Sequence, residues 1–313
     1  MQRTFIVGCP RSGTTVVQAM LARHPEVFTL PETAFFQRLL GDINHRLLGD
    51  PHAPLATKRA TRSWEALGRR LGLTSPEGRR EFVMLQQTLL GAAYAGSRSP
   101  WFQDACVIRF IGILDELAQR DGRSVWLEKT PHHLLYLEEI EHYVPNAKVI
   151  HVIRPGIDVL ASINDAYFRY QIEAFSGSLM QWIRRWNRAA EIHRSRMGNA
   201  NHLLVFHEDL ISSPTTEWAR LCRFMELTPH TDIDEICHQN IADLNSEPWK
   251  RDALAGRPQQ VDRKVVNQFG PQLRSWLRER LSSYEELYAE NHVIRDAEQA
   301  PARPTSMSEE AIS

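Results

Sequence analysis

The chain has 313 residues, of which 42% are hydrophobic and 24% charged, with a formal net charge of −1. This composition is typical of a globular protein with a sizeable core. The near-neutral charge excludes a general nucleic-acid-binding protein, which would carry a basic domain. No apolar run reaches the roughly 20 residues that span a bilayer, which excludes a membrane span.

The four cysteines, Cys9, Cys106, Cys222 and Cys237, show neither a close pair nor the spacing of metal ligands. This favours reduced thiols and no metal site. The first strand is predicted to begin near Arg3, which leaves no room for a signal peptide, so we expect a cytoplasmic protein.

The first part of the chain predicts one strand followed mostly by helices. The apolar run Phe5-Ile6-Val7 predicts a strand over Thr4–Val7. Apolar residues at helical spacing predict a helix over about 13–23, ended by Pro25. Residues 33–121 have mainly helical patterns. Two helices are expected there: Glu81–Ala95 and Ile108–Arg120.

The second part alternates strands with helices. The predicted strands are Val125–Leu127, Lys148–Ile153 and Leu203–Phe206. The predicted helices begin after Pro131, after Pro155, at about Leu179 and at Ser213. This alternation predicts an α/β fold in which a parallel sheet carries helices on both faces.

Two segments lack a core pattern. Asn245–Phe269 is polar and irregular, which predicts a functional loop. Residues 296–313 are rich in Ala, Pro, Ser and Glu, which predicts a disordered tail. Residues 1–295 are therefore expected to form a single α/β domain.

A glycine-rich loop, Gly8-Cys9-Pro10-Arg11-Ser12-Gly13-Thr14-Thr15, links the first strand to the first helix. Backbone N–H groups at such a helix start bind anions, and Gly13 allows a phosphate to approach closely. Ser12, Thr14 and Thr15 add hydroxyl groups. Thr14 stands where a P-loop has its lysine, which counts against ordinary NTP hydrolysis or kinase chemistry. Arg11 supplies a positive charge inside the loop instead.

A second phosphate site is predicted after the strand Lys148–Ile153. Arg154 follows the carboxyl end of this strand, where open α/β sheets bind ligands, and Ser162 lies two helical turns later. A guanidinium and a hydroxyl placed in this way suit a phosphate. The alternative is that Arg154 pairs with Asp158 and only caps the helix.

Two further charged residues are candidates for catalysis. Lys129 lies just after the strand Val125–Leu127. Its ammonium group could stabilise negative charge that develops on a transferring group or on the leaving oxygen. The alternative is a solvated surface lysine. Glu32 follows the first helix and suits a general base toward a hydroxyl; the alternative is an N-cap or a salt bridge.

Taken together, these segments resemble the PAPS-dependent sulfotransferase superfamily, in the same order, from about Thr4 to Ala289. The likeness is greatest to the tyrosylprotein sulfotransferases and the bacterial group that shares their layout. Pro10–Thr15 resembles the 5′-phosphosulfate loop, and the segment from Arg154 to Ser162 resembles the 3′-phosphate motif. Phe206–Leu210 resembles the "YEDL"-type segment, with His207 in place of the usual tyrosine.

The resemblance implies a P-loop-like fold and a role for each matched residue. Arg11 and Lys129 would contact the sulfuryl group and the bridging oxygen, and Glu32 would take the proton of the acceptor. The 5′-phosphosulfate would lie on Ser12, Gly13, Thr14 and Thr15. The 3′-phosphate would be held by Arg154, Ser162 and Lys264. Ser246 would lie near the sulfuryl group.

The implied reaction moves a sulfuryl group from PAPS to a hydroxyl of a small molecule, glycan or lipid, with PAP as product and without a metal. Helices from 33 to 121 would form the wall of the acceptor pocket. Six aromatic residues are available to line it, although core packing is the expected fate of most of them: Phe35, Phe36, Trp101, Phe102, Tyr167 and Phe168. Two alternatives stay open: a P-loop kinase acting on a small molecule, and a non-catalytic nucleotide-binding protein. The identity of the acceptor and the oligomeric state also stay open.

Overall fold

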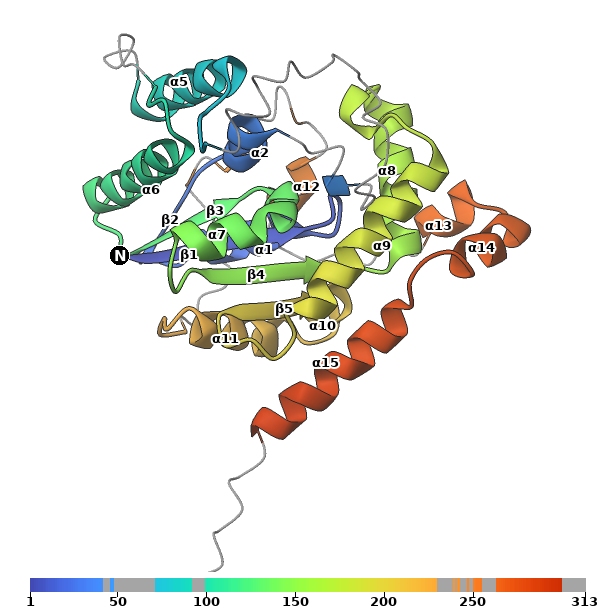
Figure 1. Ribbon diagram of the computed structural model, residues 1–313. Helices are drawn as coiled ribbons and strands as arrows, with labels where there is room; N and C mark the ends of the chain where they lie inside the picture. The colour runs from blue at the N-terminus through green and yellow to red at the C-terminus, as the bar shows by residue number, and fades with distance from the viewer. Residues whose placement is uncertain are drawn as a thin grey trace, which may run out of the picture.

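A five-stranded parallel sheet with the order β2-β3-β1-β4-β5 forms the centre of the molecule (Figure 1). The computed structural model describes residues 1–41, 46–47, 71–91, 99–229, 239, 241–242, 247, 250–254 and 263–299. The strands are β1 (Gln2–Gly8), β2 (Val27–Thr29), β3 (Val125–Lys129), β4 (Lys148–Ile153) and β5 (His202–Phe206). The sequence did not predict β2, because three residues are too few to show a periodic pattern.

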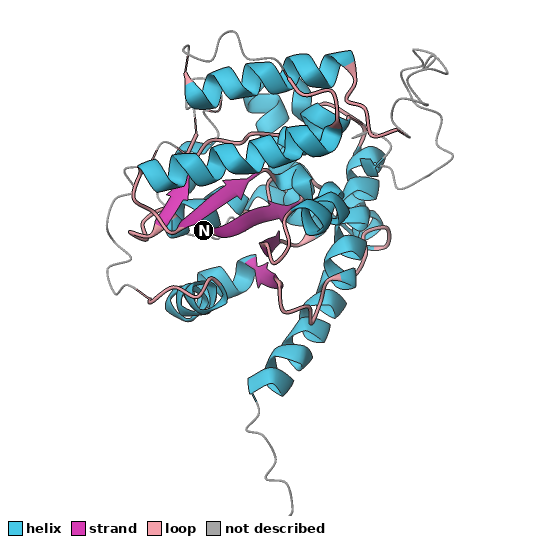
Figure 2. Cartoon of the chain, turned by 60° about the vertical axis from the view of Figure 1, so that its left-hand side comes forward, coloured by secondary structure: helices cyan, strands magenta, loops and turns pink. Residues whose placement is uncertain are grey.

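Successive side chains of β1 point to opposite faces of the sheet, and each face is covered by helices. Phe5 and Val7 belong to the larger core cluster, whereas Ile6 belongs to a second one. The larger cluster is closed by α6 (Gln103–Arg120), α7 (Leu137–Tyr143), α8 (Gly156–Tyr170) and α9 (Leu179–Ser195). The second is closed by α1 (Thr14–Leu21) and α11 (Pro214–Phe224), and Figure 2 shows helices on both sides of the strands. The predicted α/β fold, with a parallel sheet flanked on both faces, is confirmed.

The remaining described elements are short or peripheral. They are α2 (Phe35–Leu40), α5 (Pro76–Leu90), η2 (Pro131–Tyr136), η3 (Glu173–Phe175), α10 (His207–Ser212), α12 (Arg251–Leu254), α13 (Arg263–Gln268), α14 (Pro271–Arg278) and α15 (Tyr284–Gln299). The helix expected over Glu81–Ala95 begins earlier, because the Ser75 hydroxyl accepts a hydrogen bond from the N–H of Gly78 and Pro76 suits the first helical position. It ends at Gly91, whose φ of 82° leaves the helical region.

Two segments of the structure differ from what the sequence predicts. The polar segment 245–269 contains α12 and α13, because Ala253 packs against one core cluster and Val265 against the other. The apolar residues of these two short helices are too few to form a periodic pattern in the sequence. At the end of the chain α15 continues to Gln299, past the predicted start of the tail at 296, and residues 300–313 lie outside the described residues.

The carboxyl ends of the strands gather the polar residues that the sequence analysis singled out. The glycine loop follows β1, Lys129 ends β3, Arg154 follows β4 and His207 follows β5. Because the strands are parallel, all these residues lie at one edge of the sheet. Among the described residues, no helix combines the length and apolarity needed to cross a membrane.

Candidate active site

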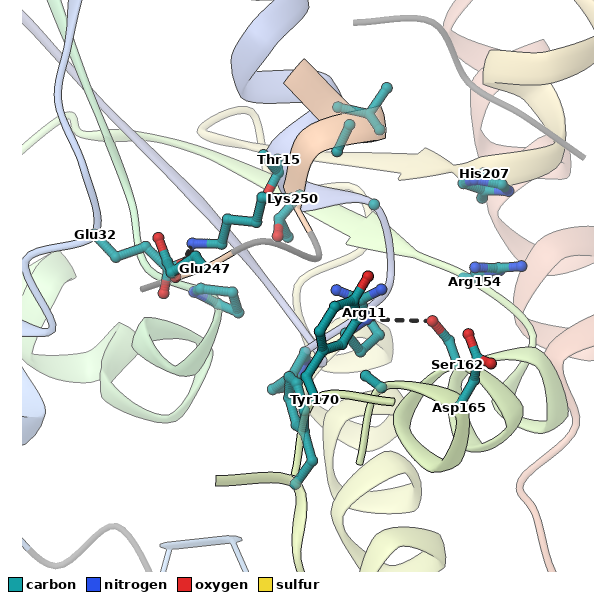
Figure 3. Close-up of a pocket in the computed structure, with 18 of the residues that line it drawn as sticks. Arg11, Thr15, Glu32, Arg154, Ser162, Asp165, Tyr170, His207, Glu247 and Lys250 are labelled. Carbon is teal, nitrogen blue, oxygen red and sulfur yellow. Dashed lines mark hydrogen bonds and ion pairs between the residues drawn. The ribbon is translucent and has the colours of Figure 1, made fainter. Parts of the chain in front are cut away.

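A cavity of about 390 Å³ opens at the carboxyl edge of the sheet (Figure 3). Its size lies within the range of about 300–1,000 Å³ that is usual for ligand pockets. The glycine loop and the start of α1 form one side, and α8 and α13 form another. Glu32, Glu247 and Lys250 line the cavity at the end opposite Arg154 and His207.

The glycine loop has the backbone of an anion cradle. A Cβ atom at Gly8 would lie 2.5 Å from the carbonyl oxygen of Val152, so only glycine allows β1 to continue here beside β4. Gly13, at a φ of 104°, turns the chain into α1. Thr14 and Thr15 line the cavity, and the N–H groups of the first helical turn have no acceptor within the helix. These features fit a bound phosphate.

Ser12 occupies a different place from its neighbours. Its side chain is buried with the residue only 1% exposed, and its N–H donates to the carbonyl of Cys9 at 3.1 Å. Ser12 is absent from the cavity wall, whereas Arg11, Gly13, Thr14 and Thr15 are part of it. The described geometry therefore gives Ser12 a role in the turn of the loop.

Arg11 points from the loop toward α8. It has a φ of 74°, an unusual value for a residue with a side chain. Its Nε donates to Ser162 Oγ at 3.2 Å, and its guanidinium lies 5.9 Å from the ring centre of Phe175. Burial and the neighbouring charge of Arg154 lower the pKa of Arg11. The two guanidinium groups thus form a positively charged region in the cavity.

Arg154 and Ser162 line this same region (Figure 3). Lys264 also lines the cavity. Burial lowers the pKa of Arg154, although Asp158 acts in the opposite direction. Lys264 Nζ forms an ion pair with Asp165 Oδ2 at 2.9 Å. The helix α13 carries Lys264 to this position by packing Val265 against the core cluster that includes α8.

Glu32 is held by two lysines at the other end of the cavity. Lys129 Nζ contacts Glu32 Oε1, and Lys250 Nζ lies 2.7 Å from the same oxygen. Lys129 is fully buried, which excludes the alternative of a solvated lysine, and it also donates to Thr15 Oγ1 at 3.4 Å. Burial raises the pKa of Glu32, but the two lysines outweigh it and lower the pKa to about 2.

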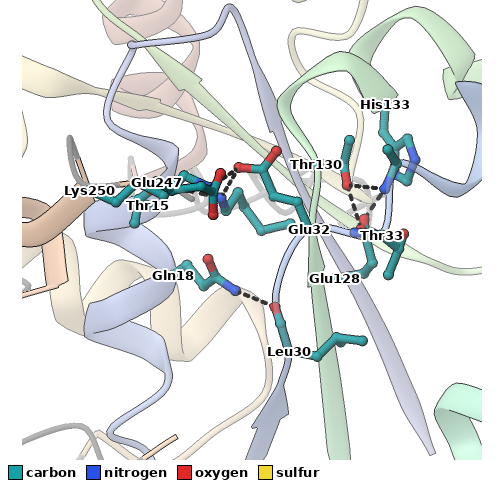
Figure 4. Close-up of polar contacts among 12 residues, drawn as sticks. Thr15, Gln18, Leu30, Glu32, Thr33, Glu128, Thr130, His133, Glu247 and Lys250 are labelled. Atoms are coloured by element: carbon teal, nitrogen blue, oxygen red, sulfur yellow. Dashed lines mark hydrogen bonds and ion pairs between the residues drawn. The ribbon is translucent and has the colours of Figure 1, made fainter. Parts of the chain in front are cut away.

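A buried hydrogen-bond network fixes the segments that carry Glu32 and Lys129 (Figure 4). Glu128 Oε1 accepts from the hydroxyls of Thr33 at 2.8 Å and Thr130 at 2.6 Å, and Glu128 Oε2 lies 2.8 Å from His133 Nδ1. Because neighbouring side chains of a strand point to opposite faces, Glu128 and Lys129 serve different parts of the molecule. The sequence pattern at Lys129 gave no indication of this supporting role of Glu128.

The segment that begins with His207 joins the cavity to the last helix. His207 lines the cavity and packs against Gly13. Glu208 accepts a hydrogen bond from Tyr284, and Asp209 accepts one from Tyr288 at 2.6 Å. Glu208 and Asp209 therefore anchor α15 rather than a ligand.

Several predicted residues lie away from the cavity wall. Phe35 and Phe36 are core residues, and the exposed rings of Trp101, Phe102 and Phe168 lie elsewhere, as does Tyr167. The aromatic residues that line the cavity are Tyr170, Phe175 and Trp182. None of those six aromatic residues lines the described cavity: α2 uses Phe35 and Phe36 for packing, and the other four rings lie away from the cavity wall. Ser246 and Cys237 lie outside the described residues.

The order of the motifs along the chain can now be compared with known proteins. A sequence model described as "Sulfotransferase family" matches residues 3–232, which contain the glycine loop, Glu32, Lys129, Arg154 and Ser162. The chain belongs to the sulfotransferase family. Protein-tyrosine sulfotransferase A of Caenorhabditis elegans is 27% identical over 231 residues, 71% of this chain and 49% of that protein.

A second curated relative and a solved structure are also similar to this chain. The protein-tyrosine sulfotransferase of Drosophila melanogaster is 27% identical over 232 residues, 72% of this chain and 38% of that protein. The chain thus spans about half the length, or less, of these curated relatives. The sulfotransferase domain of the Synechococcus PCC 7002 olefin synthase aligns over 96% of both chains, with 18% identity and a TM-score of 0.48.

Proposed function

We propose that this protein transfers the sulfuryl group of PAPS to a hydroxyl group of an acceptor. One observation carries the proposal: the same cavity is lined by two groups of residues. The glycine loop, Arg154, Ser162 and Lys264 line one end. Glu32, in contact with Lys129, lies at the other end. Membership of the sulfotransferase family supports the same reaction. When bound, PAPS supplies an activated sulfuryl group and a phosphate leaving group.

Arg11, Arg154 and Lys264 lie at one end of the cavity, its cationic end, which suits the two phosphate groups of the donor. Thr14 and Thr15 offer first-turn N–H groups and hydroxyls to the 5′-phosphosulfate, and Gly13 lets the backbone come close. Arg154, Ser162 and Lys264 would hold the 3′-phosphate. Arg11, which reaches from the glycine loop to Ser162, would neutralise charge on the 5′ side.

The other end of the cavity suits the acceptor. Glu32 would accept the hydroxyl proton, and Lys129, which already contacts Glu32 and Thr15, would stabilise charge that develops on the leaving oxygen. These two cationic groups, Arg11 and Lys129, would supply the charge stabilisation that phosphoryl transfer obtains from Mg²⁺, so we propose transfer without a metal.

The broader expectations stand as parts of the same proposal. The acceptor is a small molecule, a glycan or a lipid hydroxyl. The protein acts in the cytoplasm, a location that the free thiols of Cys9, Cys106 and Cys222 fit. Residues 1–295 form one domain, since the larger core cluster runs from Phe5 to Leu287.

Transfer from ³⁵S-labelled PAPS into a host metabolite extract tests the proposal. We expect a labelled product with the wild type and a loss of about 100-fold or more with Glu32→Gln, because the base can no longer accept a proton. PAP should still bind Glu32→Gln, since Glu32 lies away from the cationic end. Arg154→Ala should weaken PAP binding about tenfold or more, measured by calorimetry.

Matched controls make this result specific. Lys148→Met removes a lysine that pairs with Glu226 away from the cavity, and it should change neither transfer nor PAP binding. Phosphate release from Mg-ATP in place of sulfate transfer would instead identify a kinase. Normal PAP binding without a labelled product in any extract would favour a non-catalytic nucleotide-binding protein.

A further inference from the structure

Glu32 and Glu247 are bridged by one ammonium group, that of Lys250 (Figure 4). Lys250 Nζ lies 2.7 Å from Glu32 Oε1 and also contacts Glu247 Oε1. Lys129 contacts the same oxygen of Glu32 from β3. Glu32 therefore has two cationic partners, and one of them is shared with a second carboxylate that also lines the cavity.

Lys250 is fixed in place by its surroundings. Its side chain is only 7% exposed, and its backbone N–H donates to the carbonyl of Glu247 at 3.0 Å. The helix α12 follows immediately, with Ala253 packed against the core cluster that includes α1. Leu254 packs against a smaller cluster that contains Ala19 and Ala22. Folding thus presents this lysine to Glu32, even though the two residues lie far apart in the sequence.

We propose that Lys250 is a positioning residue that sets how strongly Glu32 holds a proton, with Glu247 as the competing partner of Lys250. This inference rests on the proposed function, in which Glu32 is the base. Lys129 would also stabilise the charge that develops on the leaving oxygen. A second cation is therefore needed that stays with the carboxylates throughout the reaction. Lys250 fills this need because it contacts Glu32 and Glu247 at once.

The charges balance through the transfer. The acceptor oxygen forms a bond to sulfur, its proton passes to Glu32, and the sulfur–oxygen bond to the 5′-phosphate breaks with its electron pair left on the phosphate oxygen. Glu32 is then neutral and holds Lys250 only weakly. Glu247 keeps the ammonium group paired, so no unpaired charge is left buried beside the product.

The charges around Glu32 decide in which direction its pKa changes when Lys250 is replaced. Burial raises the pKa of Glu32, whereas Lys129 and Lys250 lower it. Removing the charge of Lys250 leaves burial opposed by Lys129 alone, so the pKa of Glu32 should rise. Arginine at position 250 keeps the positive charge and should preserve the low value.

The test is a ¹³C NMR titration of the protein labelled with glutamate at the carboxyl carbon, in which Glu32→Gln identifies the Glu32 signal. In the wild type we expect this signal to stay at the ionised position down to about pH 4. In Lys250→Met it should titrate at least about one pH unit higher than in the wild type, a tenfold change in proton affinity. Lys250→Arg and Lys148→Met should behave as the wild type. Lys250→Gln serves as a second neutral variant, and PAP binding confirms that each variant is folded.

An unchanged Glu32 titration in both neutral variants would overturn the inference. The titration requires neither donor nor acceptor, so its outcome is separate from that of the labelled-sulfate assay. Once an acceptor is found, Lys250→Met should move the acidic limb of kcat/KM upward by the same amount and leave the KM for PAPS unchanged. A fall in kcat with no movement of that limb would mean that Lys250 has only a structural role.

Discussion

Several charged side chains in and beside the cavity have partners of opposite sign, and those partners decide what each charge can do. Lys264 pairs with Asp165, Lys129 with Glu32, and Lys250 with both Glu32 and Glu247. Sequence patterns place Lys129 at a strand end and Glu32 after the first helix. They contain no information about Lys250, because an isolated lysine in a polar segment has no periodic or motif signal.

Asp165 offers a residue-scale test of the cationic end. Its carboxylate lies 2.9 Å from Lys264 Nζ and 2.9 Å from Arg169 Nε, in a region proposed to hold a phosphate. Asp165→Asn removes a negative charge there, so PAP should bind about fivefold more tightly at low salt. The gain should shrink at high salt because the charges are partly exposed.

Calorimetric titration with PAP at two salt concentrations measures this effect. Asp115→Asn is the matched control, since Asp115 pairs with Arg3 at the amino end of β1. Weaker binding by Asp165→Asn would show instead that the carboxylate is required to hold Lys264 in position.

At the scale of the elements, the start of α8 must lie very close to α9 for Arg154 and Ser162 to reach the cavity. A Cβ atom at Gly156 would lie 2.8 Å from Trp186 Cδ2 and 2.9 Å from Leu281 Cδ2. The indole N–H of Trp186 donates to the carbonyl of Arg154 at 3.2 Å, which ties the two helices to the end of β4. Glycine is required here for space rather than for backbone freedom.

Gly156→Ala should therefore destabilise the protein by about 1–3 kcal/mol, the usual cost of overpacking. Gly112→Ala is the matched control, because Gly112 lies in α6 and an added Cβ atom meets nothing within 4 Å. That substitution should stabilise the fold by about 0.5–1 kcal/mol through helix propensity. Urea unfolding followed by circular dichroism measures both, and equal effects of the two substitutions would contradict the close α8–α9 contact.

At the scale of the whole molecule, a chain of buried histidines links the sheet to its flanking layer. His151 on β4 lies 2.9 Å from His193 on α9 through their Nδ1 atoms, and its Nε2 lies 2.9 Å from Nδ1 of His202. Burial lowers the pKa of His193 to about 3 and that of His202 to about 4, and it places that of His151 well below its usual value. These rings are neutral in the folded protein.

The stability of the molecule should consequently fall in mild acid. The folded pKa values lie below the unfolded value of about 6.5, so between about pH 6.5 and pH 4 the unfolded chain binds protons that the folded protein does not. Each such histidine lowers the free energy of unfolding by about 1.4 kcal/mol per pH unit in this window. The contribution is fully present above about pH 6.5 and is lost as the pH falls.

Urea unfolding at about pH 7 and about pH 5 measures this loss. His193→Leu removes one of the protonating groups, so the free energy of unfolding should depend less steeply on pH than in the wild type. A stability that does not change across this range would contradict the buried neutral chain.

Much of the architecture was predictable because it rests on local patterns. The strands β1, β3, β4 and β5 are short apolar runs that end at polar residues, and such runs predict buried parallel strands. β2, α12 and α13 were missed, since they have only three, four and six residues and show no periodic pattern. These elements form because they pack against the rest of the fold, and their own sequences do not predict them.

The sequence by itself determined the fold class, the glycine loop, the positions of Lys129 and Arg154 at strand ends and the position of Glu32 after the first helix, because these features depend on residues that are neighbours along the chain. Only the tertiary structure decided which charges meet. It placed Lys250 on Glu32, Lys264 on Asp165 and Arg11 on Ser162. Each of these pairs joins segments that are distant along the chain, and their contact depends on the packing of the helices at the carboxyl edge of the sheet.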